Sequence, residues 1–200
     1  MDWLLYENEK YQQGFKVVCG IDEAGRGPLA GPVYAAAVIL KKGQTIEGVN
    51  DSKKLSEKKR EALYNKIIDE CLAYAIGVAD EKEIDEINIL QATFLAMKRA
   101  VDGLSIKPDC ALVDGNQIPP LDCSVTTVIK GDSKSESIAA ASILAKVARD
   151  RYMLEMAQKY PQYCFEKHKG YGTKLHYEKI EKHGICDIHR KSFLKKVLNK

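Results

Sequence analysis

The stretch from Asp22 to Pro32 constrains this chain more than any other, because its composition restricts both the backbone and the chemistry. It reads Asp-Glu-Ala-Gly-Arg-Gly-Pro-Leu-Ala-Gly-Pro and lies between two apolar runs that begin at Val17 and Val33. Glycines let the backbone approach a ligand closely, and prolines hold a loop stiff. Carboxylates suit a hard cation, whereas exposed amides and an arginine suit a phosphate or a sugar hydroxyl. The stretch therefore indicates a metal-bound phosphodiester as its ligand.

Two further carboxylates follow strand-like runs later in the chain. Asp114 follows the apolar run 110–113, and Asp132 follows the run 125–129. Gly/Pro-rich turns between strands are common, so Asp22 and Glu23 taken alone are equally consistent with the plain end of a strand. Ends of adjacent strands can bring distant residues together, and we therefore expect these carboxylates to form one cluster.

Composition is that of one globular domain. The 200 residues are 45% hydrophobic and 30% charged, and a chain of this length buries about 70% of its unfolded surface. The longest apolar run, 33–40, is far shorter than the roughly 20 residues of a membrane helix. The N-terminus also lacks the order of a secretory signal. We expect a cytoplasmic protein with no membrane partner.

The net charge is compatible with a nucleic-acid partner without demonstrating one, and the cysteines bear on the redox state and on zinc. The net charge is +3, and basic residues outnumber acidic ones beyond Lys159, a pattern that a solvated helical face explains equally well. The six cysteines form no Cys-x-x-Cys pair, which predicts reduced thiols. Cysteines and histidines between Cys164 and His189 have irregular spacing that fits no usual zinc pattern. We expect no structural zinc.

Periodicity predicts an α/β fold with a mixed sheet, because strands alternate with helices after an initial meander. An N-terminal helix over 1–14 is expected to cover the core through Trp3, Leu4 and Tyr11. Strands are expected at 17–23, 33–40 and about 45–49, these three paired antiparallel, and then at 73–79, 110–113 and 125–129. Helices are expected from about 56 to 71, from Asp80 with a Glu83 cap to about 104, and from about 136 to 159, where alanines permit close approach to the sheet. The chain thus divides into an N-terminal helix (1–16), a core (17–159) and a basic C-terminal helical segment (160–200) of the same domain.

Six motifs, in order along nearly the whole chain, resemble ribonuclease HII. They are Asp22–Val33, Asn50–Leu55, Asn88–Ala92, Val113–Gly115, Ser137–Val147 with Arg149-Asp150, and Gly170–Lys174. One tract departs, since Gly184–Phe193 lacks the prolines often seen before the His-Arg-x-Ser-Phe segment. The resemblance implies a ribonuclease H-like mixed sheet flanked by helices, with a small C-terminal helical segment.

The resemblance also implies an endonuclease that hydrolyses the RNA strand of RNA/DNA hybrids. It implies cutting 5′ to ribonucleotides embedded in duplex DNA, with 5′-phosphate and 3′-hydroxyl products, and hence removal of misincorporated ribonucleotides. The catalytic and metal-binding residues carried over by motif are Asp22, Glu23, Asp114 and Asp132. The cofactor is Mg²⁺ or Mn²⁺, and two ions about 4 Å apart would activate a water and stabilise the leaving oxygen.

Strand geometry sets a condition on this ligand set. Successive side chains of a strand point to opposite faces, so Asp22 and Glu23 cannot both face the site from a regular strand. We expect either a bend at Glu23 or a contribution from its backbone carbonyl or from the rim. Asp22 and Asp114 rank first as ligands.

Substrate contacts implied by the resemblance come from three parts of the chain. The residues are Gly25, Arg26, Gly27, Lys53, Tyr171, Arg190 and Ser192. The Gly25-Arg26-Gly27 backbone is expected at the ribose 2′-hydroxyl, with Tyr171 stacked on the neighbouring sugar; from the sequence alone, Tyr171 between two glycines would be assigned as a loop anchor. Phosphate contacts are expected from Lys167, Lys169, Lys174, Arg190 and Lys191.

Two other functions compete with this interpretation. Type 3 ribonuclease H has an additional N-terminal domain, and only sixteen residues precede Val17 here. A non-catalytic hybrid-binding protein would not need all four carboxylates. A P-loop enzyme is excluded because no Gly-Lys-Ser/Thr follows the glycines. We expect a monomer that binds a hybrid or a ribonucleotide-containing duplex; the sequence carries no signal for or against recruitment by a sliding clamp.

Overall fold

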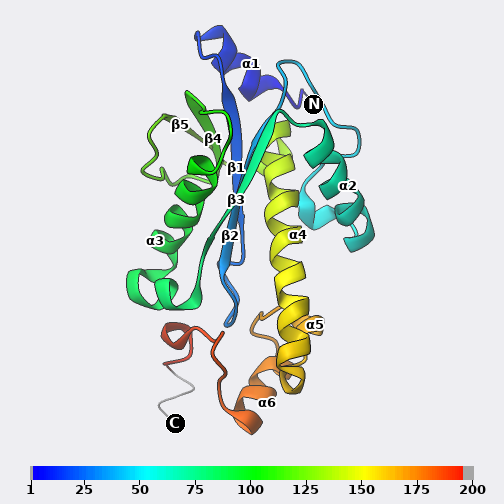
Figure 1. The fold of residues 1–200 in the computed structure, drawn as a ribbon, viewed down its shortest axis with the longest axis vertical. Coiled ribbons are helices and arrows are strands. Elements are labelled where there is room, and N and C mark those ends of the chain that lie inside the picture. Colours follow the sequence, from blue (N-terminus) through cyan, green and yellow to red (C-terminus); the bar gives the residue numbers. More distant parts are fainter. Residues whose placement is uncertain (1, 196–200) are drawn as a thin grey trace.

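A computed structural model describes residues 2–195. Its centre is a five-stranded sheet in the order β3-β2-β1-β4-β5 (Figure 1). The strands are β1 (Val18–Ala24), β2 (Val33–Ile39), β3 (Ala73–Ala79), β4 (Cys110–Asp114) and β5 (Ser124–Val128). β1, β2 and β3 pair antiparallel, whereas β4 and β5 extend the sheet parallel to β1. The mixed α/β fold is thus confirmed.

Helices cover both faces of this sheet. They are α1 (Leu5–Gln12), α2 (Glu57–Glu70), α3 (Glu81–Asp102), α4 (Glu136–Lys159), α5 (Phe165–His168) and α6 (Lys174–His183). Short 3-10 turns are η1 (Ser52–Lys54), η2 (Gly131–Ser133), η3 (Pro161–Tyr163) and η4 (Lys191–Phe193). α3 lies on one face and α4 on the other with α2 beyond it, while α5 and α6 lie near the far end of α4 (Figure 1). No helix among residues 2–195 is long and apolar enough to cross a membrane.

The strand expected at 45–49 is wrong. The third strand of the meander is instead β3, whose Ala73–Ala79 pairs along all of β2. The 45–49 segment is irregular, and its Ile46 N–H donates to the carboxylate of Glu136 at 2.8 Å instead of joining a strand. A buried side-chain acceptor therefore replaces the ladder partner that the local pattern predicted.

Two expected helices differ from the structure at their ends or middle. The N-terminal helix begins at Leu5, so Trp3 and Leu4 precede it. The capping box of Asp80 and Glu83 is confirmed, but α3 is interrupted at Asn88, whose φ is 67°. The Asn88 side chain accepts from the N–H of Leu90 at 3.0 Å and thereby caps the second half of the helix.

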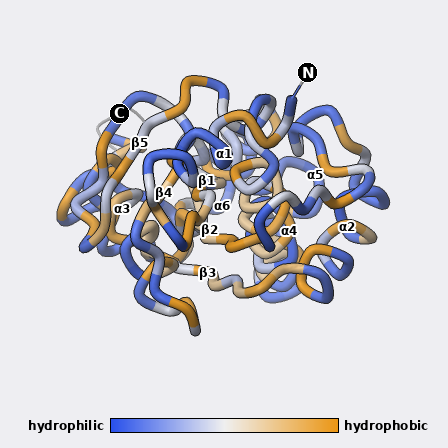
Figure 2. The backbone as a smooth tube through the Cα atoms, turned by 90° about the horizontal axis from the view of Figure 1, so that it is seen from above, coloured by the Kyte–Doolittle hydropathy of each residue, from blue (hydrophilic) through white to orange (hydrophobic). Residues whose placement is uncertain are grey.

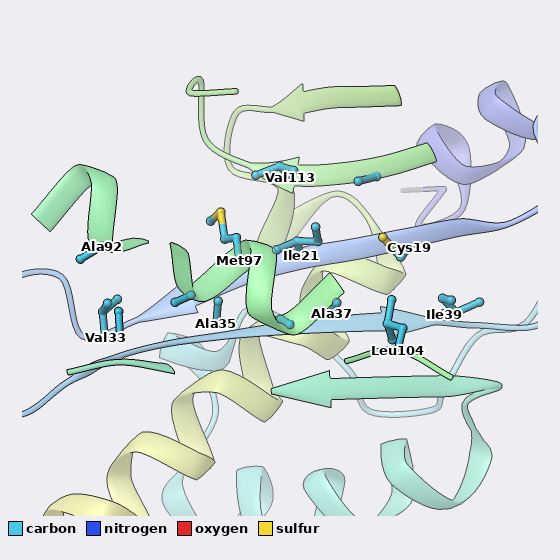
Figure 3. Close-up of a cluster of buried hydrophobic side chains, with 14 of the residues drawn as sticks. Cys19, Ile21, Val33, Ala35, Ala37, Ile39, Ala92, Met97, Leu104 and Val113 are labelled. Carbon is cyan, nitrogen blue, oxygen red and sulfur yellow. The ribbon is translucent and has the colours of Figure 1, made fainter. Parts of the chain in front are cut away.

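The α3 face of the sheet holds the larger apolar cluster. Ile21, Ala35 and Ala37 point from β1 and β2 toward α3, where Met97 covers them (Figure 3). Alternate residues of a strand face opposite sides, so Val18, Gly20 and Asp22 of β1 lie on the α4 side. In Figure 2 the hydrophobic colours of β2 and α4 meet near the middle of the molecule.

The α4 face is packed so closely that backbone touches backbone. A Cβ on Gly20 of β1 would collide with the peptide of Ser137 at the start of α4. Ala139, Ala140 and Ala141 are fully buried in the same layer. The close approach predicted from the alanines is confirmed, and it brings the start of α4 against the first half of β1.

The start of α4 is also fixed by α1. Glu7 is buried, and its Oε1 accepts from the hydroxyls of Ser135 and Ser137, each at 2.6 Å, and from the Ser137 N–H at 3.0 Å. A carboxylate at a helix N-terminus satisfies otherwise unpaired donors and favours the helix dipole. α1 therefore does more than cover the core, since it positions the helix that borders the site.

Candidate metal centre and nucleic-acid interface

Three carboxylates meet at one edge of the sheet. Ligand oxygens of Asp22, Asp114 and Asp132 all lie within 4.8 Å of one another. Asp22 and Asp114 come from the ends of the parallel neighbours β1 and β4, and Asp132 comes from η2, just beyond β5. The sequence pattern of carboxylates at strand ends thus corresponds to a real cluster.

Asp114 also positions the turn that carries Asp132. Its Oδ1 accepts from the N–H of Gly131 at 2.6 Å and from that of Asp132 at 3.4 Å. A Cβ on Gly131 would lie 2.6 Å from Cδ1 of Ile138, so that side chain would have to shift. Two of the three carboxylates are therefore tied to each other through backbone.

Glu23 lies on the opposite face of β1, as strand alternation requires. Asp22 is 4% exposed and faces α4, whereas the Glu23 carboxylate lies 3.5 Å from Nη1 of Arg26. Glu23 also lines a cavity of about 80 Å³ together with Asp114 and Asn116. It is thus at the rim of the cluster and is absent from the group of three.

Burial and mutual repulsion disfavour the ionised form of two of these carboxylates. Burial, reinforced by the charges of Glu23 and Asp114, raises the pKa of Asp22 well above its usual value. Burial and the charge of Asp132 raise the pKa of Asp114. Both effects penalise the ionised carboxylates, so bound positive charge would stabilise this site.

Lys53 reaches the cluster from η1. Its Nζ lies 3.2 Å from Oδ2 of Asp132, and the Lys53 side chain is 77% exposed. The turn is held on α4 by Ser52, whose hydroxyl lies 2.8 Å from that of Ser142. Lys53 is therefore placed to meet both the carboxylates and a ligand bound over them.

The loop after β1 is supported from below by two buried arginines. Arg190 donates to the carbonyls of Gly25 at 2.6 Å, Arg26 at 2.9 Å and Gly31 at 2.8 Å. Arg149 donates to the carbonyls of Ala30, Pro32 and Lys169. Both arginine side chains have zero exposure. The loop shape thus depends on residues far away in the sequence.

One expected phosphate contact, at Arg190, is wrong, and Ser192 has a structural partner besides its expected role. The guanidinium of Arg190 is buried beneath the loop, where it cannot meet a phosphate directly. The Ser192 hydroxyl and N–H both bond to the carboxylate of Asp85, so Ser192 serves to anchor η4. Neither role was visible in the sequence, because the partners are more than 100 residues distant.

Tyr171 lies beside the loop and is open to solvent. It is 43% exposed, the Arg149 guanidinium carbon lies 5.8 Å from its ring centre, and a Cβ on Gly27 would lie 3.8 Å from the ring. Leu29 donates its N–H to the carbonyl of Gly170 at 2.8 Å, which joins the two loops. Arg26, Gly27 and Tyr171 therefore form one surface, with buried Gly25 beneath it.

The basic residues of the last segment divide into exposed and buried groups. Lys167, Lys174 and Lys191 are exposed and Lys169 is partly so, in contrast to Arg190.

All six cysteines are free. His176 and His189 are buried with their Nε2 atoms 3.1 Å apart, and burial lowers the pKa of each to about 4. Among residues 2–195, the aspartate cluster is the one group that brings three potential metal-binding side chains together.

Comparison with known proteins decides the family. The ribonuclease HII family model matches residues 19–196. This chain belongs to the ribonuclease HII family. Ribonuclease HII of Caldicellulosiruptor bescii is 59% identical over 193 residues, which cover 96% of this chain and 94% of that protein. Ribonuclease HII of Clostridioides difficile is 59% identical over 97% of this chain and 76% of its own length.

A solved structure agrees with the fold. The ribonuclease H2 of Pyrococcus horikoshii OT3 superposes with a TM-score of 0.74 at 32% identity, covering 88% of this chain and 93% of that one. The protein is thus an endonucleolytic ribonuclease H, and its family acts on RNA/DNA hybrids with divalent metals. The aspartate cluster fits such an ion, because carboxylate oxygens are the ligands that hard divalent cations prefer.

Proposed function

We propose that this ribonuclease HII cuts 5′ to single ribonucleotides embedded in duplex DNA, as well as within RNA/DNA hybrids. The observation that carries the proposal is the short link between two sites. β1 places Asp22 in the cluster and continues into Gly25-Arg26-Gly27, beside which lies exposed Tyr171. A phosphate at the cluster and a ribose at the loop would thus be neighbours on one strand. The biological role would be removal of misincorporated ribonucleotides in the cytoplasm.

The aspartate cluster would hold the metal in this proposal. Asp22, Asp114 and Asp132 would bind it directly, and Glu23 would contribute from the rim. When bound, Mg²⁺ or Mn²⁺ supplies activation of a water and charge stabilisation at the leaving 3′-oxygen, which accounts for 5′-phosphate and 3′-hydroxyl products. Lys53, next to Asp132, would orient the scissile phosphate as a point charge.

The Gly25–Gly27 loop and Tyr171 would select ribose. A 2′-hydroxyl both donates and accepts hydrogen bonds, and it is the one group that separates ribose from deoxyribose. Exposed backbone at Arg26 and Gly27 offers partners without an intervening side chain at Gly27. The ring of Tyr171 would stack on the neighbouring sugar. Exposed Lys167, Lys174 and Lys191, with Lys169, would contact phosphates.

One cleavage experiment tests the proposal. A labelled duplex with a single ribonucleotide is incubated with Mg²⁺, Mn²⁺ or chelator, and the product ends are mapped to the nucleotide. We expect metal-dependent cutting on the 5′ side of the ribonucleotide and no cutting of the all-deoxy duplex. Cutting of long hybrids with no cutting of this duplex would restrict the enzyme to hybrids. Light scattering of the purified protein would test the expected monomer.

A further inference from the structure

Arg190 is a buried cation that bonds both peptide carbonyls of the Gly25–Gly27 turn, in which Gly25 is buried and Arg26 and Gly27 are exposed. Its Nη2 donates to the Gly25 carbonyl at 2.6 Å and its Nη1 to the Arg26 carbonyl at 2.9 Å. Burial and the neighbouring charge of Arg149 lower the pKa of Arg190 to about 9, which leaves the group charged at neutral pH. The fork of a guanidinium fixes two acceptors at once, and no other side chain offers that geometry.

Fixing these two carbonyls also fixes two N–H groups. In a trans peptide the C=O and the following N–H point in opposite directions. The Gly25 and Arg26 carbonyls point inward to Arg190, so the N–H groups of Arg26 and Gly27 point outward. None of the hydrogen bonds within residues 2–195 uses either N–H. Gly25 permits this arrangement, because its φ is +99°.

We propose that Arg190 is the positioning residue for ribose selection, because it turns the Arg26 and Gly27 N–H groups toward the 2′-oxygen of a ribonucleotide. This inference rests on the proposed function and assigns to Arg190 an indirect role in place of a phosphate contact. Two aligned donors on one rigid turn recognise an oxygen acceptor and discriminate against a carbon-bound hydrogen.

Backbone hydrogen bonds hold the clamp in place, where the clamp is the Arg190 guanidinium with the Gly25 and Arg26 carbonyls that it bonds. η4 follows Arg190 directly, and the carboxylate of Asp85 accepts from the N–H groups of Lys191 and Ser192, each at 2.9 Å. The Arg190 N–H donates to the Leu29 carbonyl at 2.9 Å. Backbone contacts on both sides thus set the position from which the guanidinium reaches the loop.

The test compares binding of two duplexes that differ by one 2′-hydroxyl, in chelator so that neither is cut. Fluorescence anisotropy gives Kd for each with the parental protein, Arg190→Lys and Arg99→Lys. Lysine keeps the charge but is a point donor, which cannot hold both carbonyls in one plane. Arg99 is an exposed arginine paired with Glu83 and serves as the matched control. Thermal unfolding confirms that each variant is folded.

We expect the parental protein and Arg99→Lys to prefer the ribonucleotide duplex by roughly tenfold, as one added hydrogen bond allows. Arg190→Lys should bring this preference close to one, with the Kd for the all-deoxy duplex within about twofold of the parental value. A folded Arg190→Lys that keeps the preference overturns the inference. Equal weakening on both duplexes also overturns it, since that result indicates a general phosphate contact.

A second measurement does not depend on substrate. Carbonyl ¹³C resonances of Gly25 and Arg26 report their hydrogen bonds and should shift in Arg190→Lys but not in Arg99→Lys. Unchanged resonances would show that Arg190 does not hold the turn. If the parental protein cut no ribonucleotide duplex but the resonances shifted, the proposed function would fail while the clamp remained.

Discussion

The ammonium nitrogen of Lys53 lies 3.2 Å from the Oδ2 of Asp132, so an exposed cation is the neighbour of a buried carboxylate of the aspartate cluster. Any divalent ion at the cluster competes with this ion pair. Asp114 ties η2 to β4, so Asp132 cannot move away to avoid the competition. We therefore expect Lys53 to affect metal affinity as well as phosphate binding.

Replacing Lys53 by alanine should tighten Mn²⁺ binding. An exposed ion pair contributes about 0.2–1 kcal/mol, so its loss predicts an affinity gain of about 1.5- to 5-fold by isothermal titration calorimetry. Lys54→Ala is the matched control, because Lys54 pairs with Asp51 at 3.8 Å. An unchanged affinity, or the same gain in both variants, would contradict the competition.

Asp114→Asn should abolish cutting and leave duplex binding largely intact. The amide oxygen of asparagine can still accept the Gly131 N–H, so the turn should keep its shape while one metal-binding charge is lost. Gel cleavage assays with Mg²⁺ and anisotropy binding measure the two effects. Substantial Mg²⁺-dependent cutting by this variant would refute the assigned cluster.

Gly27→Ala separates substrate approach from folding. The nearest heavy atom to an added Cβ is 3.8 Å away, in the Tyr171 ring, so stability should change by less than about 0.5 kcal/mol. We expect cleavage at a single ribonucleotide to fall by about tenfold or more, because the methyl group would stand between the turn and the sugar. Normal cleavage by the folded variant would mean that no ligand approaches Gly27 closely.

Gly25→Ala is the contrasting variant. An added Cβ would collide with the Arg149 side chain, and the Gly25 φ of +99° is one that L residues rarely adopt. We expect a loss of about 2 kcal/mol or more in the free energy of unfolding, measured in urea. Equal stability of the two alanine variants would show that the turn is not held as described.

Tyr171→Ala should greatly reduce cleavage at a single embedded ribonucleotide, because it removes both ring and hydroxyl. Tyr171→Phe should cost about 1–3 kcal/mol in kcat/KM, as expected when one hydrogen-bond partner is lost. Tyr177→Ala is the control, since Tyr177 is 42% exposed, close to the 43% of Tyr171. If Tyr171→Ala folds and cuts at the parental rate, Tyr171 is not a recognition residue.

Acid should destabilise the protein through His176 and His189. The pKa of each is lowered to about 4 by burial, so the unfolded chain takes up their protons first. Their stabilisation is therefore complete above the usual pKa of about 6.5 and is lost as pH falls toward 4. Urea unfolding at several pH values should show a loss of about 3 kcal/mol per histidine over this range.

His176→Gln should flatten that pH dependence, whereas His183→Gln should not, because His183 is exposed. The comparison removes the background titration of acidic groups, which all three proteins share. The same slope in His176→Gln and the parental protein would show that the buried pair does not control acid stability.

Local patterns predicted the parts of the site that local geometry creates. Asp22, Asp114 and Asp132 end or follow neighbouring strands, and neighbouring strand ends meet at one edge. Alternation along β1 likewise predicted that Glu23 would face away from Asp22. The substrate roles of Gly25, Gly27 and Tyr171 remain predictions.

Features that depend on hydrogen bonds to distant residues, or on a side-chain cap inside an apolar pattern, were not predictable in this way. Nothing near Arg190 in the sequence indicates that its guanidinium bonds a loop 165 positions earlier. The irregular 45–49 segment similarly depends on Glu136, and the interruption at Asn88 lies inside an apolar pattern that continues unbroken. Each outcome was decided by a tertiary hydrogen bond or a side-chain cap, and hydrophobic periodicity does not indicate either of these.

The span between Gly25 and Arg190 also sets an order of events during biosynthesis. Ribosomes add roughly 5–20 residues per second, so the 165 positions between these residues correspond to on the order of ten seconds or more. Until Arg190 emerges from the ribosome, the carbonyls of Gly25 and Arg26 lack their guanidinium donor, although β1 to β4 have already been synthesised. We therefore expect a nascent chain to carry its aspartates long before its loop takes shape, so that the proposed selection of ribose would be acquired last.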